Sequence, residues 1–148
     1  MYKHILIATD GSELATKALE HGLALAKRDS SQTTVVTVTE PWSPLDVAHE
    51  VRQGRPNPVG HFEEIAAAAA KRILDIAVQR ANAHGVTCNV THVKDQHPAE
   101  GIIAVAKDKG CDLIVMASHG RRGMSRLLLG SQAHEVLTRC TVPVLIVR

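Results

Sequence analysis

The stretch from Ala117 to Ser131, ASHGRRGMSRLLLGS, combines residue types suited to holding an anion, and is called the glycine loop below. It contains three arginines, one histidine and three glycines, and no acidic residue. Glycine lets a backbone approach a ligand closely with its N–H groups turned inward, and arginine supplies positive charge. Gly130-Ser131 would open a helix, whose N-terminus adds unpaired N–H groups and a partial positive charge. These features are typical of a phosphate-binding loop.

The same residues also allow a purely structural interpretation. Glycines between a strand and a helix can satisfy turn geometry, Ser131 can cap the helix, and surface arginines can be solvated. The chain contains neither GxxxxGK[ST] nor GxGxxG, so conventional P-loop hydrolysis and Rossmann-type dinucleotide binding both lose support. At the level of the motif, a phosphate cradle and a plain turn both stay open.

Five apolar runs that alternate with helical patterns must position this loop. Continuously apolar strands separated by helices predict a parallel sheet covered on both faces, with right-handed crossovers. We therefore expect a single α/β domain, residues 1–148, with a doubly wound five-stranded sheet of order 3-2-1-4-5. The strands are expected at His4–Thr9, Thr33–Thr39, Val86–Val93, Asp112–Ala117 and Val142–Val147, with four helices between them.

The helical segments carry more detailed expectations. Asp10 followed by Glu13 resembles a capping box with Asp10 as the N-cap of the first helix. Residues 40–60 contain four prolines and no periodicity, which predicts a long loop or lid. The alanine run Ala66–Ala70 is assigned to close packing of a helix on the sheet. That second helix is expected from about His61 to His84, ended by Gly85, with Phe62, Ile65, Ala69, Ile73, Ile76 and Ala77 facing inward.

The expected strand order also predicts where a ligand would bind. Ligands of open α/β sheets bind beyond the carboxyl ends of the strands, where the winding reverses, which here is between the first and fourth strands. Asp10-Gly11-Ser12 follows the first of these strands, and the glycine loop follows the other. An anion site between the two loops is the resulting hypothesis.

Composition excludes several classes of function. The net charge is +2 and aromatic residues make up 2% of the 148 residues, which argues against nucleic acid as a partner. Three widely spaced cysteines and scattered histidines give no metal-ligand spacing and no disulfide framework. No apolar run approaches the length of a membrane span, so we expect no membrane association and a cytoplasmic location.

Several segments together resemble the universal stress protein family. They are the opening ILIATDGS, the DLIVMASHGRRG segment, LLLGS and the closing VPVLIV, so the resemblance covers essentially the whole chain. ATP-binding members carry the pattern Gly-x2-Gly-x9-Gly-Ser/Thr. Gly120, Gly130 and Ser131 match it, and Ala117 stands where the pattern has its first glycine. Because Ala117 should end a strand, where φ is negative, we expect alanine to be tolerated.

The resemblance implies a flavodoxin-like or adenine nucleotide α-hydrolase-like fold that holds ATP, with Mg²⁺ as a candidate companion ion bound through Asp10. It also implies a homodimer in which the closing strands Val142–Val147 pair antiparallel, which would cover an apolar edge. Arg121 and Arg122 would be auxiliary phosphate contacts. The residues implied at the nucleotide are Ala8, Thr9 and Asp10 near ribose and phosphate, the Val38 backbone at adenine, Met116 and Ala117 at the opposite wall, and His119, Gly120, Gly130, Ser131 and Gln132 at the phosphates.

Three functions remain to be distinguished. The leading one is a stress-response regulator that holds ATP without turning it over, or with very slow turnover. An ATPase or autophosphorylating enzyme is the second, since Asp10, His119 or Ser131 could take part in phosphoryl transfer. The third is a member that binds no nucleotide and acts through protein contacts.

Overall fold

A computed structural model describes residues 1–121 and 128–148 and contains one parallel sheet. The strand order is β3-β2-β1-β4-β5, with every neighbouring pair parallel, which confirms the predicted fold class and winding. The winding of the sheet therefore reverses between β1 and β4, which are neighbours. The strands are β1 (His4–Ala8), β2 (Gln32–Val38), β3 (Cys88–Val93), β4 (Leu113–Ala117) and β5 (Val144–Val147).

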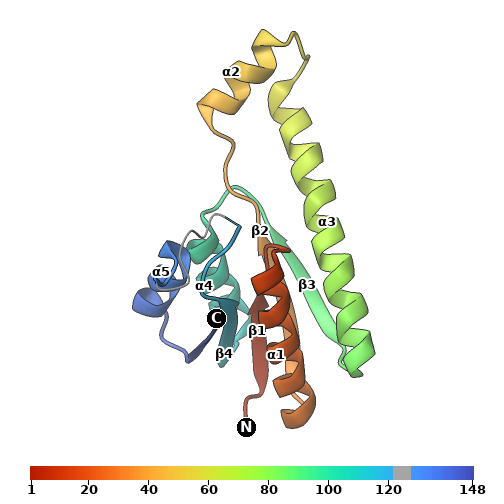
Figure 1. Ribbon diagram of the computed structural model, residues 1–148, viewed down its shortest axis with the longest axis vertical. Coiled ribbons are helices and arrows are strands. Elements are labelled where there is room, and N and C mark those ends of the chain that lie inside the picture. Colours follow the sequence, from red (N-terminus) through yellow and green to blue (C-terminus); the bar gives the residue numbers. More distant parts are fainter. Residues whose placement is uncertain (122–127) are drawn as a thin grey trace.

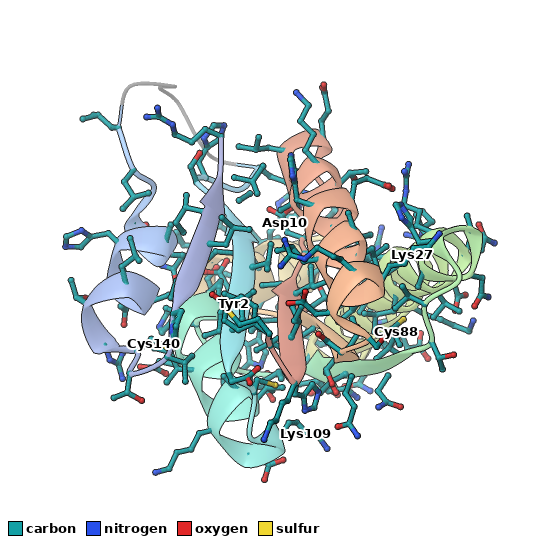
Figure 2. The ribbon with its side chains drawn as sticks, turned by 90° about the horizontal axis from the view of Figure 1, so that it is seen from below. Tyr2, Asp10, Lys27, Cys88, Lys109 and Cys140 are labelled. Atoms are coloured by element: carbon teal, nitrogen blue, oxygen red, sulfur yellow. The ribbon has the colours of Figure 1, made fainter. Side chains whose placement is uncertain are left out.

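Helices cover both faces of the sheet (Figure 1). On one face lie α1 (Glu13–Asp29) and α3 (Pro58–His84), and on the other α4 (Pro98–Lys109) and α5 (Ser131–Arg139). Figure 2, a view from below, shows the strands between these two layers. Successive β1 side chains enter opposite layers: Ile5 and Ile7 pack under α1, and Leu6 packs with α4 and α5. Burial on both faces explains why the strands are apolar throughout rather than alternating.

A further helix, α2 (Pro44–Arg52), lies within the segment expected to be a loop. That expectation was wrong because Pro44 occupies the first turn of a helix, where proline needs no N–H partner. Ser43 and Asp46 form a capping box, in which the Ser43 hydroxyl accepts a hydrogen bond from the Asp46 N–H at 3.1 Å. No residue of α2 is buried, and α2 projects beyond the sheet together with the start of α3 (Figure 1).

The inward face of α3 also differs from expectation. The helix begins at Pro58, three residues before the predicted start, and Gly85 ends it in a left-handed conformation as predicted. Ile65 and Ile76 are more than half exposed. Ala77 is buried as predicted. The buried residues of α3 are small apart from one leucine: Ala70, Leu74, Ala77 and Ala81.

The start of α1 is capped by a different residue from the one predicted. Ser12 is the N-cap, and its hydroxyl accepts a hydrogen bond from the Ala15 N–H at 3.2 Å. Asp10 lies two residues earlier, and its carboxylate accepts hydrogen bonds from the Ser12 and Arg121 N–H groups. In the part of the chain that the structure describes, none of the helices combines the length and apolar character that crossing a membrane requires.

Candidate functional site

A cavity of about 550 Å³ lies at the carboxyl ends of β1, β2 and β4, where the winding of the sheet reverses. Its volume is within the range of small-molecule sites. Residues from both loops predicted to form the site line it. Of the predicted site residues, Ala8, Thr9, Asp10, Val38, Met116, Ala117, His119, Gly120, Arg121, Gly130, Ser131 and Gln132 all line the cavity, and Arg122 lies outside the described residues.

One end of the cavity is apolar. Met116 from β4 and Pro98 and Ile102 from α4 line it, beside the last residues of β2. Along a parallel strand, the N–H and C=O of one residue point to the same side, and the side alternates from residue to residue. The Val36 carbonyl points toward β1, because it accepts a hydrogen bond from the Thr9 N–H at 3.0 Å. Val38 lies two residues further along β2, so its N–H and C=O point to the same side, just past the end of β1. A backbone donor and acceptor therefore face this end of the cavity.

The other end is formed by the two ends of the glycine loop, which lie against each other. Gly130 is the N-cap of α5, and its N–H donates a hydrogen bond to the Ser118 carbonyl at 2.7 Å. A Cβ on Gly130 would lie 2.7 Å from that same carbonyl oxygen. The φ of Gly130 is −61°, so glycine is needed here for close approach and not for a left-handed backbone.

The sequence left open whether Ser131 caps α5 or acts on a ligand. The N-cap is Gly130, and the described residues make no side-chain capping bond there, so the Ser131 hydroxyl is not the N-cap group. Ser131 is the first residue of α5, is exposed and lines the cavity. The N-terminus of α5 thus presents a hydroxyl and the partial positive charge of a helix end to the cavity.

Asp10 joins the two loops. One carboxylate oxygen accepts a hydrogen bond from the Ser12 N–H at 2.9 Å, and the other accepts one from the Arg121 N–H at 3.0 Å. Gly120 also lies against this carboxylate, since a Cβ placed on it would be 2.6 Å from Oδ2. The start of the glycine loop is therefore held to the loop that follows β1.

The Arg121 side chain supplies positive charge at this end. A Cβ on Gly11 would lie 3.1 Å from Arg121 Nη2 and 2.9 Å from Ile73 Cγ1, so both side chains rest against Gly11. Gly11 has a φ of +79°, which together with this contact explains the glycine. The guanidinium consequently lies at the edge of the cavity, between α3 and the first turn of α1.

Gln132 has a role that sequence reasoning missed. Its side-chain oxygen accepts a hydrogen bond from the Ala99 N–H at 2.9 Å. His97, the N-cap of α4, makes no capping bond with its side chain. Gln132 therefore caps α4 from α5, and fixes two helices whose first turns both line the cavity.

The alanine run of α3 was assigned to helix–sheet packing, but part of it lines the cavity. Ala66, Ala69 and Ala70 face it together with Ile73. The lengths of the elements could have indicated this, because a helix of 27 residues spans about 40 Å and a strand of seven residues about 23 Å. One half of α3 must extend past the strand ends, and small residues there leave room for a ligand.

Metal ligands are sparse. Within residues 1–121 and 128–148, no three His, Cys, Asp or Glu side chains come together in a group that could hold a metal ion. The three cysteines are free, and burial raises the pKa of the Cys111 thiol to about 11. Two acidic residues line the cavity, Asp10 at the end formed by the glycine loop and Glu40 after β2.

Comparison with known proteins places this geometry in a family. The universal stress protein family matches residues 1–148. The chain belongs to the universal stress protein family. A relative, universal stress protein YxiE of Bacillus subtilis, is 34% identical over 152 residues, with all of both chains covered.

Solved structures of universal stress proteins share the fold. The structure of protein MJ0577, from Methanocaldococcus jannaschii, gives a TM-score of 0.80 at 27% identity, covering 99% of this chain and 96% of that one. A universal stress protein in complex with cAMP gives a TM-score of 0.70 at 24% identity, covering 99% and 97%. One from Archaeoglobus fulgidus in complex with dAMP gives 0.71 at 19% identity, covering 99% and 98%.

Proposed function

We propose that this chain is a cytoplasmic universal stress protein that binds ATP, with turnover absent or very slow, and that occupancy by the nucleotide is its regulatory signal. The observation that carries the proposal is one cavity with two chemically distinct ends. Apolar side chains and the Val38 peptide groups suit a base, and the α5 N-terminus with Arg121 suits phosphates. Proteins of the same fold hold cAMP or dAMP, which fits an adenine nucleotide.

Alanine at position 117 is compatible with this function. Ala117 is the last residue of β4 and pairs with Val147 in extended backbone. It therefore needs no left-handed conformation, and its effect is confined to one methyl group at the cavity wall. An alanine methyl there adds apolar contact without removing a hydrogen-bond donor.

Calorimetric titration with ATP tests the proposal, and Ser131→Glu sharpens it. A glutamate at the first position of α5 should abolish ATP binding, because its carboxylate would lie where phosphates are expected. Its charge favours a helix N-terminus, so the free energy of unfolding should not fall. Ala104→Glu, on the exposed side of α4, is the matched control and should bind ATP like the unsubstituted protein. Unsubstituted protein that binds no ATP would leave only the role through protein contacts.

The enzymatic alternative is separated by following the bound nucleotide. Acid precipitation of the purified protein, followed by mass spectrometry of the released small molecules, identifies what it carries. ATP recovered intact after prolonged incubation supports a binding role. Conversion to ADP with many turnovers per minute, or a phosphate on Ser131, would instead favour the ATPase or autophosphorylating enzyme.

We also propose that the protein is a homodimer joined through the closing segment Val142–Val147. β5 is an edge of the sheet and pairs with β4 along one side. An apolar edge strand open to solvent invites pairing with another strand, and a two-fold antiparallel contact would use both copies equally. Leu137 of α5 and Leu145 of β5 are partly exposed apolar residues on these elements.

A further inference from the structure

Asp10 stands between the two loops that form the phosphate end of the cavity. Ser12, whose N–H it accepts at 2.9 Å, is the N-cap of α1. Arg121, whose N–H it accepts at 3.0 Å, is 111 residues away in the glycine loop. Hydrogen bonds to a carboxylate are stronger than those between neutral groups. A single side chain therefore fixes the distance between the loop after β1 and the loop after β4.

The opposite side of the glycine loop is fixed by its own end. Gly130 donates to the Ser118 carbonyl at 2.7 Å, which sets the position of the α5 N-terminus relative to β4. Residues 118–121 are thus held on one side by Gly130 and on the other by Asp10. Ordering a loop costs conformational entropy, so a loop that is ordered in advance binds its ligand more tightly.

The surroundings of the Asp10 carboxylate do not suit a magnesium ligand. Each oxygen already accepts a backbone N–H, and Gly120 lies so close to Oδ2 that a methyl group would not fit between them. Magnesium requires near-octahedral geometry, and beside a nucleotide it is usually bound through one or two carboxylates together with phosphates and water. A carboxylate with both oxygens engaged and Oδ2 packed against Gly120 leaves little room for an ion in that geometry.

We propose that Asp10 is a positioning residue: it clasps the glycine loop to the start of α1 and is not a ligand of magnesium. This inference rests on the proposed nucleotide binding, because it concerns the role of Asp10 within that site. Any Mg²⁺ that arrives with ATP is then held by the phosphates and water. ATP affinity should depend on Asp10 to the same extent with and without the ion.

The test compares Asp10→Ala and Asp10→Asn with Glu13→Gln, an exposed acid in the first turn of α1 that does not line the cavity. ATP affinity is measured by calorimetry in Mg²⁺ and in EDTA. Asp10→Ala should weaken binding about tenfold in both buffers, the equivalent of one lost charge-assisted hydrogen bond. Asp10→Asn keeps an acceptor oxygen and should lose less, again equally in both. Glu13→Gln should change neither.

Hydrogen exchange at the Arg121 amide reads the clasp without any nucleotide. Its exchange should be slow in the unsubstituted protein and in Glu13→Gln, and at least about tenfold faster in Asp10→Ala. If Asp10→Asn abolishes only the part of the affinity that depends on Mg²⁺, Asp10 is a metal ligand and the clasp is refuted. Unsubstituted protein that binds no ATP refutes the proposed function. In that case the exchange rate of the Arg121 amide in Asp10→Ala still tests whether Asp10 holds the glycine loop. Unchanged exchange in Asp10→Ala overturns the clasp.

Discussion

Small side chains set the size and shape of the cavity. Gly120 and Gly130 leave space that the protein itself fills, with the Asp10 carboxylate at one and the Ser118 carbonyl at the other. The alanines of α3 leave space that the protein does not fill. Sequence alone does not distinguish these two uses of small residues, because a glycine or an alanine does not reveal what occupies the space beside it.

The alanine wall gives a prediction at a single position. Ala69→Leu would place a larger side chain in the cavity and should weaken ATP binding at least about tenfold, because a filled site must be reopened. Ala68→Leu is the matched control, since Ala68 is exposed on the same turn of α3, and it should bind normally. Both leucines favour a helix, so urea unfolding should be unaffected. Equal ATP affinity in the two variants would mean that the ligand does not touch α3.

The contact between α1 and α3 makes the free energy of unfolding depend on pH. Glu20 of α1 accepts hydrogen bonds from Arg80 Nη1 at 2.7 Å and His84 Nε2 at 2.6 Å, both on α3. The bond from His84, and then the bond from Arg80, hold the pKa of Glu20 below its ordinary value of 4.5. A depressed carboxyl pKa contributes stability that is present above 4.5 and is lost as the pH falls through the lowered value.

Glu20→Gln should therefore lower the free energy of unfolding at pH 7, by less than about 1 kcal/mol because the pair is partly exposed. The difference from the unsubstituted protein should shrink as the pH falls below the ordinary carboxyl pKa. Urea unfolding at pH 7 and at pH 3.5 measures it. Glu64→Gln, exposed on α3, serves as control. A difference that grows toward low pH would contradict the assigned ion pair.

The strands and most helices followed from sequence, and the exceptions have physical causes. Continuous apolar runs and right-handed crossovers leave few arrangements, which is why the order of the sheet was predictable. Proline marks loops and first turns of helices alike, so α2 was missed although Ser43 and Asp46 flank its proline correctly. The inward face of α3 was predicted correctly at Ala77 and misassigned at Ile65 and Ile76, because large apolar residues dominate a periodicity count, whereas Ala70 and Ala81 also make the contact.

The part of the site formed by the loops after the strands was predictable from sequence. The parts contributed by elements distant in the sequence were not. The loops after β1 and β4 meet because of the winding, so Asp10 and the glycine loop could be paired from sequence. Nothing local to Ala66–Ala70 reveals that these residues extend past the strand ends. The capping of α4 by Gln132 was equally hidden, since it joins residues 33 positions apart.

The proposed dimer is a property of the whole molecule. Leu145→Lys on β5 should convert it to a monomer, because a buried lysine at a two-fold contact would meet its own copy. Light scattering coupled to size-exclusion chromatography measures the mass. Val90→Lys is the control, as Val90 is partly exposed on β3 at the opposite edge of the sheet. If the unsubstituted protein is already monomeric, the proposed use of β5 is wrong.

The first part of α3 extends beyond the sheet and carries α2 at its end, so a small tilt of α3 produces a larger displacement of α2. Ile73 rests against Gly11 near the point where α3 leaves the body of the molecule, and Pro58 begins the helix 15 positions earlier. At 1.5 Å per residue that arm is about 22 Å long, so a tilt of about 5° at the cavity moves its tip by about 2 Å. Ala66 and Ala69 line the cavity along this arm, so a ligand that tilted α3 there would move α2 further than it moved the cavity wall.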